Sequence, residues 1–215
     1  AAAELVEPGM TIGLGSGRAV WRTIGLLGER DLRLRAAVAS ERTGVVAEQA
    51  GIEVVELDGK VRLDVALDGA DQLDAQLRLI KGGGGALLRE KIVISAARRF
   101  VVMAEQAKRV ERLGQGFRLP VEVAGFGWRD TCRRLAEVVE DPQLREDDEG
   151  RPYRTDEGHL ILDCALVDGA EPEALEAELS RVPGVLEHGL FIGMAARALL
   201  GRPDGGVEVL DAAAD

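Results

Sequence analysis

The sequence predicts an α/β protein with two parts, a doubly wound parallel sheet domain and a smaller α+β domain. Apolar, strand-like runs alternate with helix-like stretches through the first half of the chain, which is typical of parallel strands joined by right-handed crossovers. The second half has the order β-α-β-β-α-β of a ferredoxin-like domain. Only 3% of the residues are aromatic, so the core must consist of Ala, Leu, Val and Ile, which suits helices packed on a sheet.

Apolar runs in the first half predict strands, and longer amphipathic stretches between them predict helices. The strands are at residues 10–14, 34–39, 52–57, 61–67 and 100–104, with a further short strand at 76–80. The helices are at residues 18–29, 42–50 and 86–98, and Gly51 closes the second of them at its C′ position. We therefore expect the doubly wound sheet domain to cover residues 1–117.

The sequence pattern of the second half predicts strands and helices in a different order from that of the first half. The strands are at residues 119–123, 143–146, 153–166 and 185–192, and the helices are at 128–139 and 173–181. We place the ferredoxin-like domain at residues 118–192. The tail, residues 193–215, is expected to return to the first domain, with a short helix at 195–200 and a terminal strand at 206–210.

The charge balance excludes some classes of protein. The chain has 215 residues, with 27 Lys and Arg against 38 Asp and Glu, and a formal net charge of −11. Disorder is excluded because 46% of the residues are hydrophobic. Nucleic-acid binding is disfavoured because it needs a basic surface that displaces counterions from phosphates. An anionic ligand therefore needs a local positive site that acts against the overall field.

We expect a cytoplasmic protein that binds neither a membrane nor a metal. The two cysteines, Cys132 and Cys164, lie far apart and have no second Cys or His at metal-ligand spacing. No apolar run approaches the ~20 residues that a membrane span needs. The start of the chain lacks the basic and apolar regions of a signal peptide. The chain begins at Ala1 rather than at Met, as it does when an N-terminal piece of the natural product is missing.

A glycine cluster, GLGSG at residues 13–17, follows the first predicted strand and precedes a helix. Glycine lets the backbone approach a ligand, and the helix N-terminus supplies N–H donors for an anion. The spacing differs from the G-x-G-x-x-G of dinucleotide sites, and the second strand ends at Ala39-Ser40 without an acid for a ribose. The loop therefore favours a single phosphate, and a tight turn without a ligand is the alternative.

Ser40 opens the segment SERT, which follows the second predicted strand. Its hydroxyl and that of Thr43 are suited to a polar ligand at this turn. The alternative is that Ser40 only caps the helix that follows, since serine is among the preferred N-cap residues.

The segment DGAD, residues 68–71, follows an apolar strand that we expect at the centre of the sheet. Asp68 and Asp71 therefore lie at the carboxyl end of that strand, and this end lines the ligand crevice in open α/β sheets. Like charges held close together raise the pKa of one of them, which suits acid–base chemistry. A turn capped by Asp is the alternative.

Lys81 is followed by four glycines, Gly82 to Gly85, and then by a helix that carries Glu90. Each glycine held in regular structure costs ~1 kcal/mol relative to Ala. Backbone approach to an anion beside the lysine is the best reason for that cost, and a flexible loop is the alternative. Taken alone, Glu90 is typical of a solvated helix residue.

Together these segments reach one crevice from different strand ends. They supply a phosphate cradle, a carboxylate pair, a lysine and a further glutamate, but no metal site, catalytic histidine or Ser-His-Asp set. This inventory suits proton transfer on a small phosphorylated carbonyl compound.

The segment VALDGADQLDAQLRLIKGGGGALLREKIV resembles the signature of the type A ribose-5-phosphate isomerases. The resemblance extends in order over nearly the whole chain, through GLGSG, SERT, AEQAKRVERLG, LPVEV, GHLILDC and PGVLEHGLF. It implies a Rossmann-like domain with a ferredoxin-like small domain, and an enzyme that uses no cofactor or metal. It also implies the interconversion of ribose 5-phosphate and ribulose 5-phosphate, a step of the pentose phosphate pathway, through an enediol(ate).

The resemblance further implies roles for individual residues. Glu90 matches the base that moves the proton between C1 and C2, and Asp68 and Asp71 match the pair that assists ring opening and handles the hydroxyl protons. Lys81 belongs to the same catalytic set. The implied substrate-binding residues are Ser16, Gly17, Arg18, Ala19, Ser40, Gly69, Ala70, Gly82, Gly83, Gly84 and Lys108.

The chain departs from the family pattern in three places. The family loop is usually G-T/S-G-S-T, and here Arg18 and Ala19 take the last two places, so two hydroxyls are lost and a cation is gained. We predict that Arg18 binds the phosphate in their stead, with exposure to solvent as the alternative. Gln72 replaces the last residue of the usual DGADE, and a basic N-terminal helix is absent.

Two alternatives come from other classes of protein. A non-catalytic sugar-phosphate sensor would carry a basic DNA-binding segment and would lack the base, whereas Glu90 is present here. An acyl-CoA transferase-like enzyme would need a nucleophilic Glu in its own motif, which the sequence does not show. We expect a sugar phosphate as the ligand and a homodimer or homotetramer as the assembly.

Overall fold

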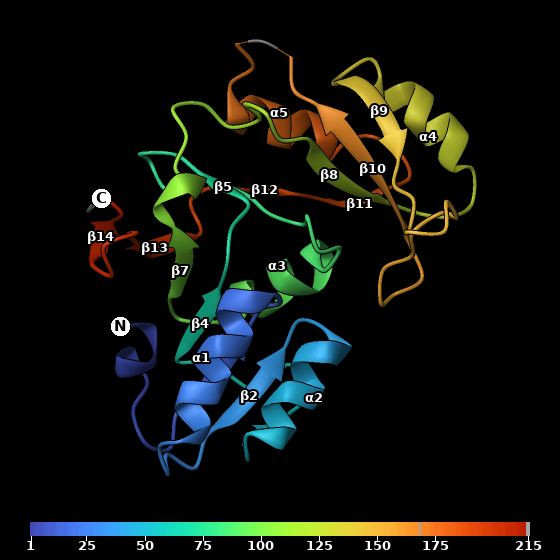
Figure 1. The fold of residues 1–215 in the computed structure, drawn as a ribbon. Helices are drawn as coiled ribbons and strands as arrows, with labels where there is room; N and C mark the ends of the chain where they lie inside the picture. The colour runs from blue at the N-terminus through green and yellow to red at the C-terminus, as the bar shows by residue number, and fades with distance from the viewer. Residues whose placement is uncertain (168, 214–215) are drawn as a thin grey trace.

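The computed structural model describes residues 1–167 and 169–213, and Figure 1 shows their arrangement. A seven-stranded sheet with the order β14-β13-β7-β4-β1-β2-β3 forms the larger part of the molecule. Its neighbours are all parallel except for β14, which pairs antiparallel with β13. The strands are β1 Thr11–Leu14, β2 Arg35–Val38, β3 Glu53–Val54, β4 Val65–Asp68, β7 Phe100–Glu105, β13 Ala195–Gly201 and β14 Val207–Asp211.

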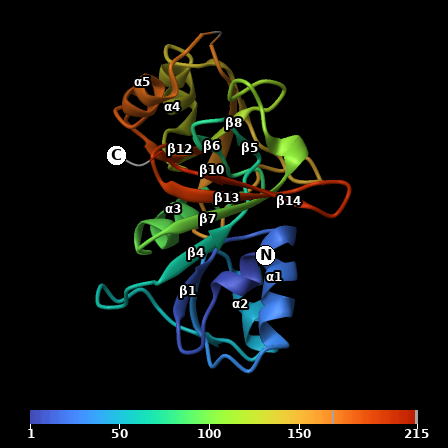
Figure 2. The same ribbon diagram turned by 90° about the vertical axis from the view of Figure 1, so that its left-hand side faces the viewer.

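Helices cover both faces of this sheet, as its doubly wound pattern requires. One face carries α1 (Arg18–Gly28) and α2 (Glu41–Gln49), together with the short 3₁₀ helix η1 (Ala2–Leu5), over a core that includes Ile12 and Leu14. The opposite face carries α3 (Leu87–Ser95). Figure 2 shows α3 and α1 on opposite sides of strands β4 and β7. This confirms the Rossmann-like, doubly wound architecture.

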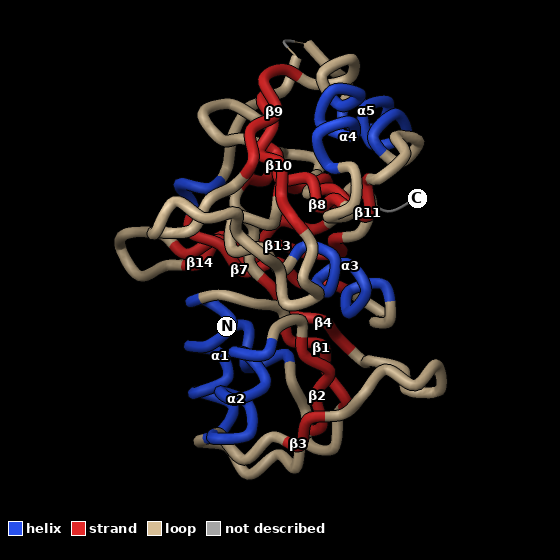
Figure 3. The backbone as a smooth tube through the Cα atoms, turned by 90° about the vertical axis from the view of Figure 1, so that its right-hand side faces the viewer, coloured by secondary structure: helices blue, strands red, loops and turns tan. Residues whose placement is uncertain are grey.

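A second, four-stranded sheet has the order β11-β8-β10-β9, and all of its neighbours are antiparallel. Its elements are β8 Leu119–Val123, α4 Trp128–Leu135, β9 Glu140–Leu144, β10 Leu160–Ala165, α5 Pro172–Leu179 and β11 Val185–His188. Figure 3 shows both helices beside this sheet, where Leu135 and Leu179 pack into its apolar core. The element order is the ferredoxin-like one that the sequence predicts.

A small third sheet connects the two larger ones. It consists of β5 (Gln72–Leu73), β6 (Leu79–Ile80) and β12 (Leu190–Phe191), in the order β12-β6-β5. Ile80 and Leu190 pack into the core of the four-stranded sheet, whereas their neighbours Leu79 and Phe191 pack into the core of the seven-stranded sheet. Side chains that alternate along these short strands therefore join the two cores.

The prediction of a short helix at residues 195–200 is wrong, because this segment belongs to strand β13. Its Ala and Leu residues favour helix, but a segment this short gains little from propensity alone. Here it pairs with β7 on one side and with β14 on the other, and Ala198 and Leu200 are fully buried. The expected return of the terminal strand to the first sheet is confirmed by β14.

The described residues include one further short helix, which lies next to the large sheet's strand β7. The 3₁₀ helix η2 (Gln106–Lys108) follows β7 directly. Within residues 1–167 and 169–213, no helix combines the length and the apolar composition that crossing a membrane requires.

Candidate active site

A cleft of about 780 Å³ lies at the carboxyl ends of the adjacent strands β7, β4, β1 and β2. This edge is where the order of the sheet changes direction, the place where open α/β sheets bind ligands. The cleft brings together almost all the residues that the sequence singles out. Those that line it are Ser16, Gly17, Arg18, Ala19, Ser40, Gly69, Ala70, Asp71, Lys81, Gly82, Gly84, Glu90 and Lys108. Asp68 lies buried beside this lining, and Gly83 is exposed next to it.

Lys81 is the centre of the site. Its Nζ lies 2.8 Å from Oδ2 of Asp68 and 3.1 Å from Oε2 of Glu90, and it donates a hydrogen bond of 2.8 Å to the carbonyl of Gly69. The three charged side chains are nearly inaccessible, with exposed fractions of 3%, 1% and 6% for Lys81, Asp68 and Glu90. The expectation that Glu90 alone is a solvated helix residue is therefore wrong, since the first turn of α3 points it into the cleft floor.

Asp68 is held by backbone groups of two loops. Its Oδ1 accepts hydrogen bonds from the N–H of Gly69 at 2.7 Å and from the N–H of Ser16 at 3.2 Å. The loop after β1 approaches so closely that a Cβ on Gly15 would lie 1.8 Å from the Asp68 carboxyl carbon. Gly15 is thus required by close packing against Asp68, which is a reason for the GLGSG cluster besides ligand binding.

Asp71 occupies the cleft wall between the carboxylate cluster and the glycine run. Its Oδ2 accepts a hydrogen bond of 2.8 Å from the N–H of Gly83, and its side chain is half-buried. Its negative charge acts on Glu90, although it is a smaller influence there than that of Asp68. The glycine run after Lys81 is therefore held in place by Asp71 rather than free.

Burial governs the protonation of this cluster. Burial is the main cause that raises the pKa of Glu90, and the charge of the nearby Asp68 carboxylate raises it further. The Lys81 ammonium lowers this pKa but only partly offsets the two, so that it is about 8. Burial also raises the pKa of Asp68, against the lowering effect of Lys81. Burial lowers the pKa of Lys81, but the two carboxylates outweigh it and raise this pKa overall. Lys81 is therefore a fixed cation, and Glu90 is a carboxyl that exchanges a proton near neutral pH.

The opposite wall of the cleft carries hydroxyls and a helix N-terminus. The hydroxyls of Ser16 and Ser40 are 3.1 Å apart, and the Ser40 hydroxyl also accepts a hydrogen bond from the N–H of Thr43 at 3.1 Å. Ser40 thus caps α2 and lines the cleft at the same time. Arg18 is exposed at the first position of α1 and forms no ion pair within the described part of the chain.

The cleft lining also includes residues that the sequence did not indicate as site residues, among them Trp21, Arg42, Tyr153 and Asp156. Arg42 stacks over the ring of Trp21 at 4.0 Å, and the Trp21 Nε1 donates to the Thr43 hydroxyl at 3.0 Å. Tyr153 and Asp156 reach the cleft from the loop between β9 and β10. Two signals in the sequence could have drawn attention to these residues, since Arg42 belongs to the segment SERT and Tyr153 is the only tyrosine of the chain. The residues next to them in the sequence, however, do not indicate that either one lines a site.

The site offers charged and polar side chains rather than metal ligands. Among the described residues, no three His, Cys, Asp or Glu side chains are arranged to hold a metal ion. What the cleft does offer is a proton-exchanging carboxyl and a fixed ammonium at one end, with hydroxyls, N–H donors and exposed arginines at the other. Fold and site together define an α/β enzyme that transfers protons on a small anionic substrate.

Comparison with known proteins identifies which such enzyme this is. The family model of ribose 5-phosphate isomerase A (phosphoriboisomerase A) matches residues 36–205. The ribose-5-phosphate isomerase A of Roseiflexus castenholzii is 52% identical over 213 residues, which are 97% of this chain and 91% of the relative. That of Parvibaculum lavamentivorans is 44% identical over 220 residues, covering 98% and 94%. The chain belongs to the ribose-5-phosphate isomerase A family, and it is an isomerase.

Solved structures agree with this assignment. Ribose 5-phosphate isomerase A from Methanocaldococcus jannaschii is 36% identical with a TM-score of 0.91, over 98% of this chain and 94% of that one. A ribose-5-phosphate isomerase in complex with phospho-erythronic acid is 33% identical with a TM-score of 0.90, over 98% and 94%. The resemblance seen in the sequence is confirmed, and neither the sensor nor the acyl-CoA transferase alternative is favoured.

Proposed function

We propose that Glu90 is the base that interconverts ribose 5-phosphate and ribulose 5-phosphate through an enediol(ate). The buried contact of Glu90 with Lys81, beside Asp68, is the observation that carries this proposal. Glu90 removes the proton from C2 of the open-chain aldose, and the electron pair moves to form the enediolate. The same proton is then delivered to C1, while O1 gains a proton and the C2 hydroxyl loses one. The hydrogen moves within one molecule, so no oxidant or reductant takes part.

Lys81 stabilises the negative charge that develops on the enediolate. Its ammonium is buried, and burial strengthens an electrostatic interaction because the surroundings screen charge less than water does. Asp68 and Gly69 orient it through the contacts described above. Asp71, which lines the cleft and is half-buried, is suited to take the hydroxyl proton during ring opening.

The phosphate end of the substrate is proposed to lie at the N-terminus of α1. Ser16, Gly17 and Ser40 present hydroxyls and N–H groups there, and a helix N-terminus favours an anion. Arg18 and Lys108 add positive charge on a chain whose net charge is −11. The further proposed substrate contacts are Ala19, Gly69, Ala70, Gly82, Gly83 and Gly84.

We also propose a cytoplasmic homodimer or homotetramer. Cys132 and Cys164 are both free, as is usual in a reducing compartment. The edge strand β14 leaves Val207 and Val209 43% and 50% exposed, and edge strands readily pair with another chain. Light scattering on the purified protein measures the mass that decides between these assemblies.

The test is an assay with ribose 5-phosphate on the wild type and on Glu90→Gln. Removal of a general base lowers kcat about 10²- to 10⁴-fold, whereas binding of phospho-erythronic acid, which one structural neighbour holds, should persist. Glu105→Gln changes another glutamate of the cleft lining and should stay within about 2-fold of the wild type. Near-wild-type turnover of Glu90→Gln would exclude Glu90 as the base.

A further inference from the structure

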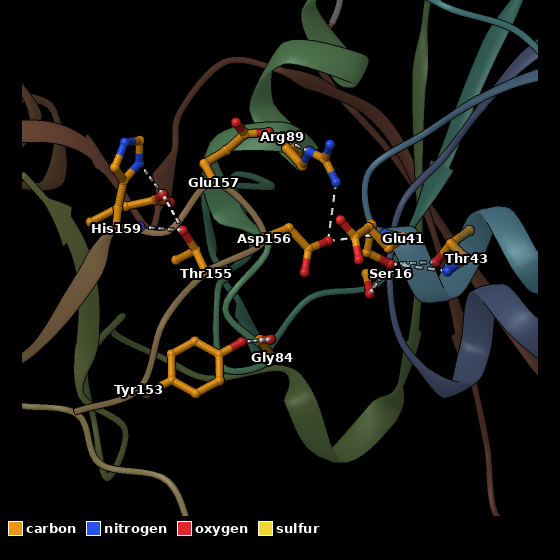
Figure 4. A network of polar contacts seen from close by, with 12 residues as sticks. Ser16, Glu41, Thr43, Gly84, Arg89, Tyr153, Thr155, Asp156, Glu157 and His159 are labelled. Atoms are coloured by element: carbon orange, nitrogen blue, oxygen red, sulfur yellow. Dashed lines mark hydrogen bonds and ion pairs between the residues drawn. The ribbon is translucent and has the colours of Figure 1, made fainter. Parts of the chain in front are cut away.

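The loop between β9 and β10 leaves the small sheet and reaches the cleft of the large one. We call residues 145–159 the strap. Its residues Tyr153 and Asp156 line the cleft, and Figure 4 shows the polar contacts that the strap makes there. The strap therefore connects the ferredoxin-like part of the chain to the site that the Rossmann-like part builds.

Asp156 joins two walls of the cleft with one carboxylate oxygen. Its Oδ2 accepts a hydrogen bond of 2.9 Å from the N–H of Glu41 and lies 3.1 Å from a guanidinium nitrogen of Arg89 (Figure 4). Glu41 is the first residue of α2 and directly follows Ser40. Arg89 directly precedes Glu90 on α3. A single side chain thus bridges the hydroxyl wall and the wall that carries the base.

The contact with α2 is a favourable one for a carboxylate. The first N–H groups of a helix have no partner within the helix, and they carry a partial positive charge. Asp156 supplies the partner for the first of them, next to the Ser40 hydroxyl that contacts Ser16. Asp156 therefore contacts the end of α2 that is adjacent to the Ser16–Ser40 pair.

A buried carboxylate holds the strap from the side of the small sheet. Glu122, on β8, is 1% exposed, and its Oε1 accepts a hydrogen bond of 3.0 Å from the Thr155 hydroxyl and lies 2.9 Å from Nδ1 of His159. The Thr155 hydroxyl in turn accepts from the N–H of His159 at 3.2 Å. These bonds hold the turn that presents Asp156 against β8 of the small sheet.

The strap also holds the glycine run of the site. The Tyr153 hydroxyl donates to the carbonyl of Gly84 at 3.2 Å, and Arg145 donates to the carbonyl of Gly82 at 2.9 Å. A Cβ on Gly85 would lie 2.3 Å from the Tyr153 hydroxyl oxygen, so any larger residue here would displace the Tyr153 side chain. The strap therefore contacts the hydroxyl wall, the α3 wall and the glycine run.

We propose that Asp156 is a positioning residue, which holds α2 and α3 at the separation that the sugar phosphate needs. The proposal rests on the proposed function, in which the phosphate lies on the Ser16–Ser40 side and the reacting carbons lie at Glu90. A substrate that is bound at both ends reacts only if the walls are correctly spaced. A wall that lies out of place weakens its contacts with one end of the substrate, and loss of binding that substrate and transition state share raises KM more than it lowers kcat.

The test compares Asp156→Ala with Glu157→Gln. Glu157 pairs with the same Arg89 at 2.8 Å but, in the described part of the chain, forms no hydrogen bond or ion pair with α2, so it is the matched control. Asp156→Ala should raise KM for ribose 5-phosphate ~10-fold with a smaller fall in kcat, because the displaced wall no longer contributes fully to substrate binding. Glu157→Gln should stay within ~2-fold, as expected for an exposed ion pair. Hydrogen exchange at the Glu41 amide should be faster in Asp156→Ala only.

Asp156→Asn separates positioning from charge and from stability. The Asn side-chain oxygen still accepts from the Glu41 N–H, so KM should return to within ~3-fold of the wild type. A purely structural role would lower the melting temperature and the active fraction of Asp156→Ala but would leave KM unchanged. Unchanged KM together with faster exchange at Glu41 would overturn the proposal, and so would an equal rise of KM in Glu157→Gln.

These outcomes are distinguishable from failure of the proposed function. If Glu90→Gln is active, the assignment of the base fails, whatever the strap variants show. If Glu90→Gln is inactive and Asp156→Ala has the KM of the wild type, only the positioning role fails.

Discussion

At the scale of single residues, the environment of Glu90 decides its chemistry. Glu90 lies in the first turn of α3, where a helix N-terminus stabilises a negative charge. Burial and the nearby Asp68 carboxylate outweigh this and the Lys81 ammonium, and they raise the pKa of Glu90 to about 8. A carboxyl with such a pKa is matched to proton transfer near neutral pH.

This pKa predicts how activity depends on pH. The base must be deprotonated, so kcat/KM should rise about 10-fold per unit of pH below about 8 and level off above it. Deprotonation of Lys81 should cause no fall in kcat/KM at moderately alkaline pH, because the pKa of Lys81 is raised. The profile is best measured between roughly pH 6.5 and 9.5, where the substrate phosphate (second pKa ~6) is mostly a dianion. A flat profile over this range would contradict the assignment.

The raised pKa of Glu90 also makes the stability of the folded protein depend on pH, which gives an independent test of this pKa. A carboxyl whose pKa is higher in the folded state binds a proton more tightly there, so its contribution to stability is lost as the pH rises. The window runs from the ordinary value of 4.5 to about 8. Urea unfolding should therefore show Glu90→Gln gaining stability relative to the wild type between pH 5 and pH 8. If Glu90→Gln and the wild type differ in stability by the same amount at pH 5 and at pH 8, the pKa of Glu90 is not raised.

At the scale of elements, the first turn of α1 carries the clearest departure from the family pattern. Arg18 begins this helix, lines the cleft and is exposed. The side chain is accessible to solvent, and it also borders the proposed phosphate site. Whether it binds the phosphate stays a prediction.

Arg18→Ala should raise KM for ribose 5-phosphate about 10-fold or more, with a smaller change in kcat. The reason is the loss of a charge-assisted hydrogen bond, which contributes ~1.5–3 kcal/mol. Arg22→Ala is the matched control, because Arg22 also lines the cleft but lies one turn further along α1. An unchanged KM in Arg18→Ala would leave the phosphate to backbone N–H groups, Ser16 and the lysines.

Local patterns predicted the starts of the main helices well, and the extent of the strands less well. The three helices of the large domain and the two of the small one begin within a few residues of their predicted starts. The segment at residues 195–200 became a strand because two neighbouring strands were available for pairing, which no local window reveals. The strands predicted at 52–57 and 153–166 are shorter, because only part of each run has a partner.

At the scale of the whole molecule, the hydrophobic cores of the large and small sheets are connected by side chains of the short third sheet. The short sheet of β5, β6 and β12 contributes side chains to both cores, as described above. Lys91 on α3 adds a polar connection: it pairs with Glu187 at 2.7 Å and donates to the carbonyls of His188 and Leu190. The domain boundaries at 117/118 and 192/193 stay a prediction.

This shared packing predicts that both parts unfold together. The two tryptophans report on them separately, because Trp21 on α1 packs against the core of the large sheet and Trp128 on α4 against that of the small one. Trp21→Phe and Trp128→Phe each leave one reporter. Urea unfolding followed by fluorescence should have the same midpoint in each variant as far-ultraviolet circular dichroism of that same variant. Separate midpoints for the fluorescence and circular dichroism transitions would show two independent units.

The sequence by itself determined the βα alternation, the ferredoxin-like order and the polar segments at the strand ends. These depend on residues close together in the chain, through hydrophobic periodicity and turn chemistry. Parallel strands present their carboxyl ends at one edge of a sheet, so the strand pattern alone places the segments GLGSG, SERT, DGAD and KGGGG in a common crevice.

Only the tertiary structure decided the properties that depend on distant parts of the chain. The pKa of Glu90 depends on its burial beside Asp68 and Lys81, and the position of Arg42 depends on the ring of Trp21. The placement of Asp156 depends on Glu122 beneath the strap and on the N-terminus of α2 across the cleft. Burial and bridging contacts arise when segments pack, so the local sequence around these residues carries no sign of them.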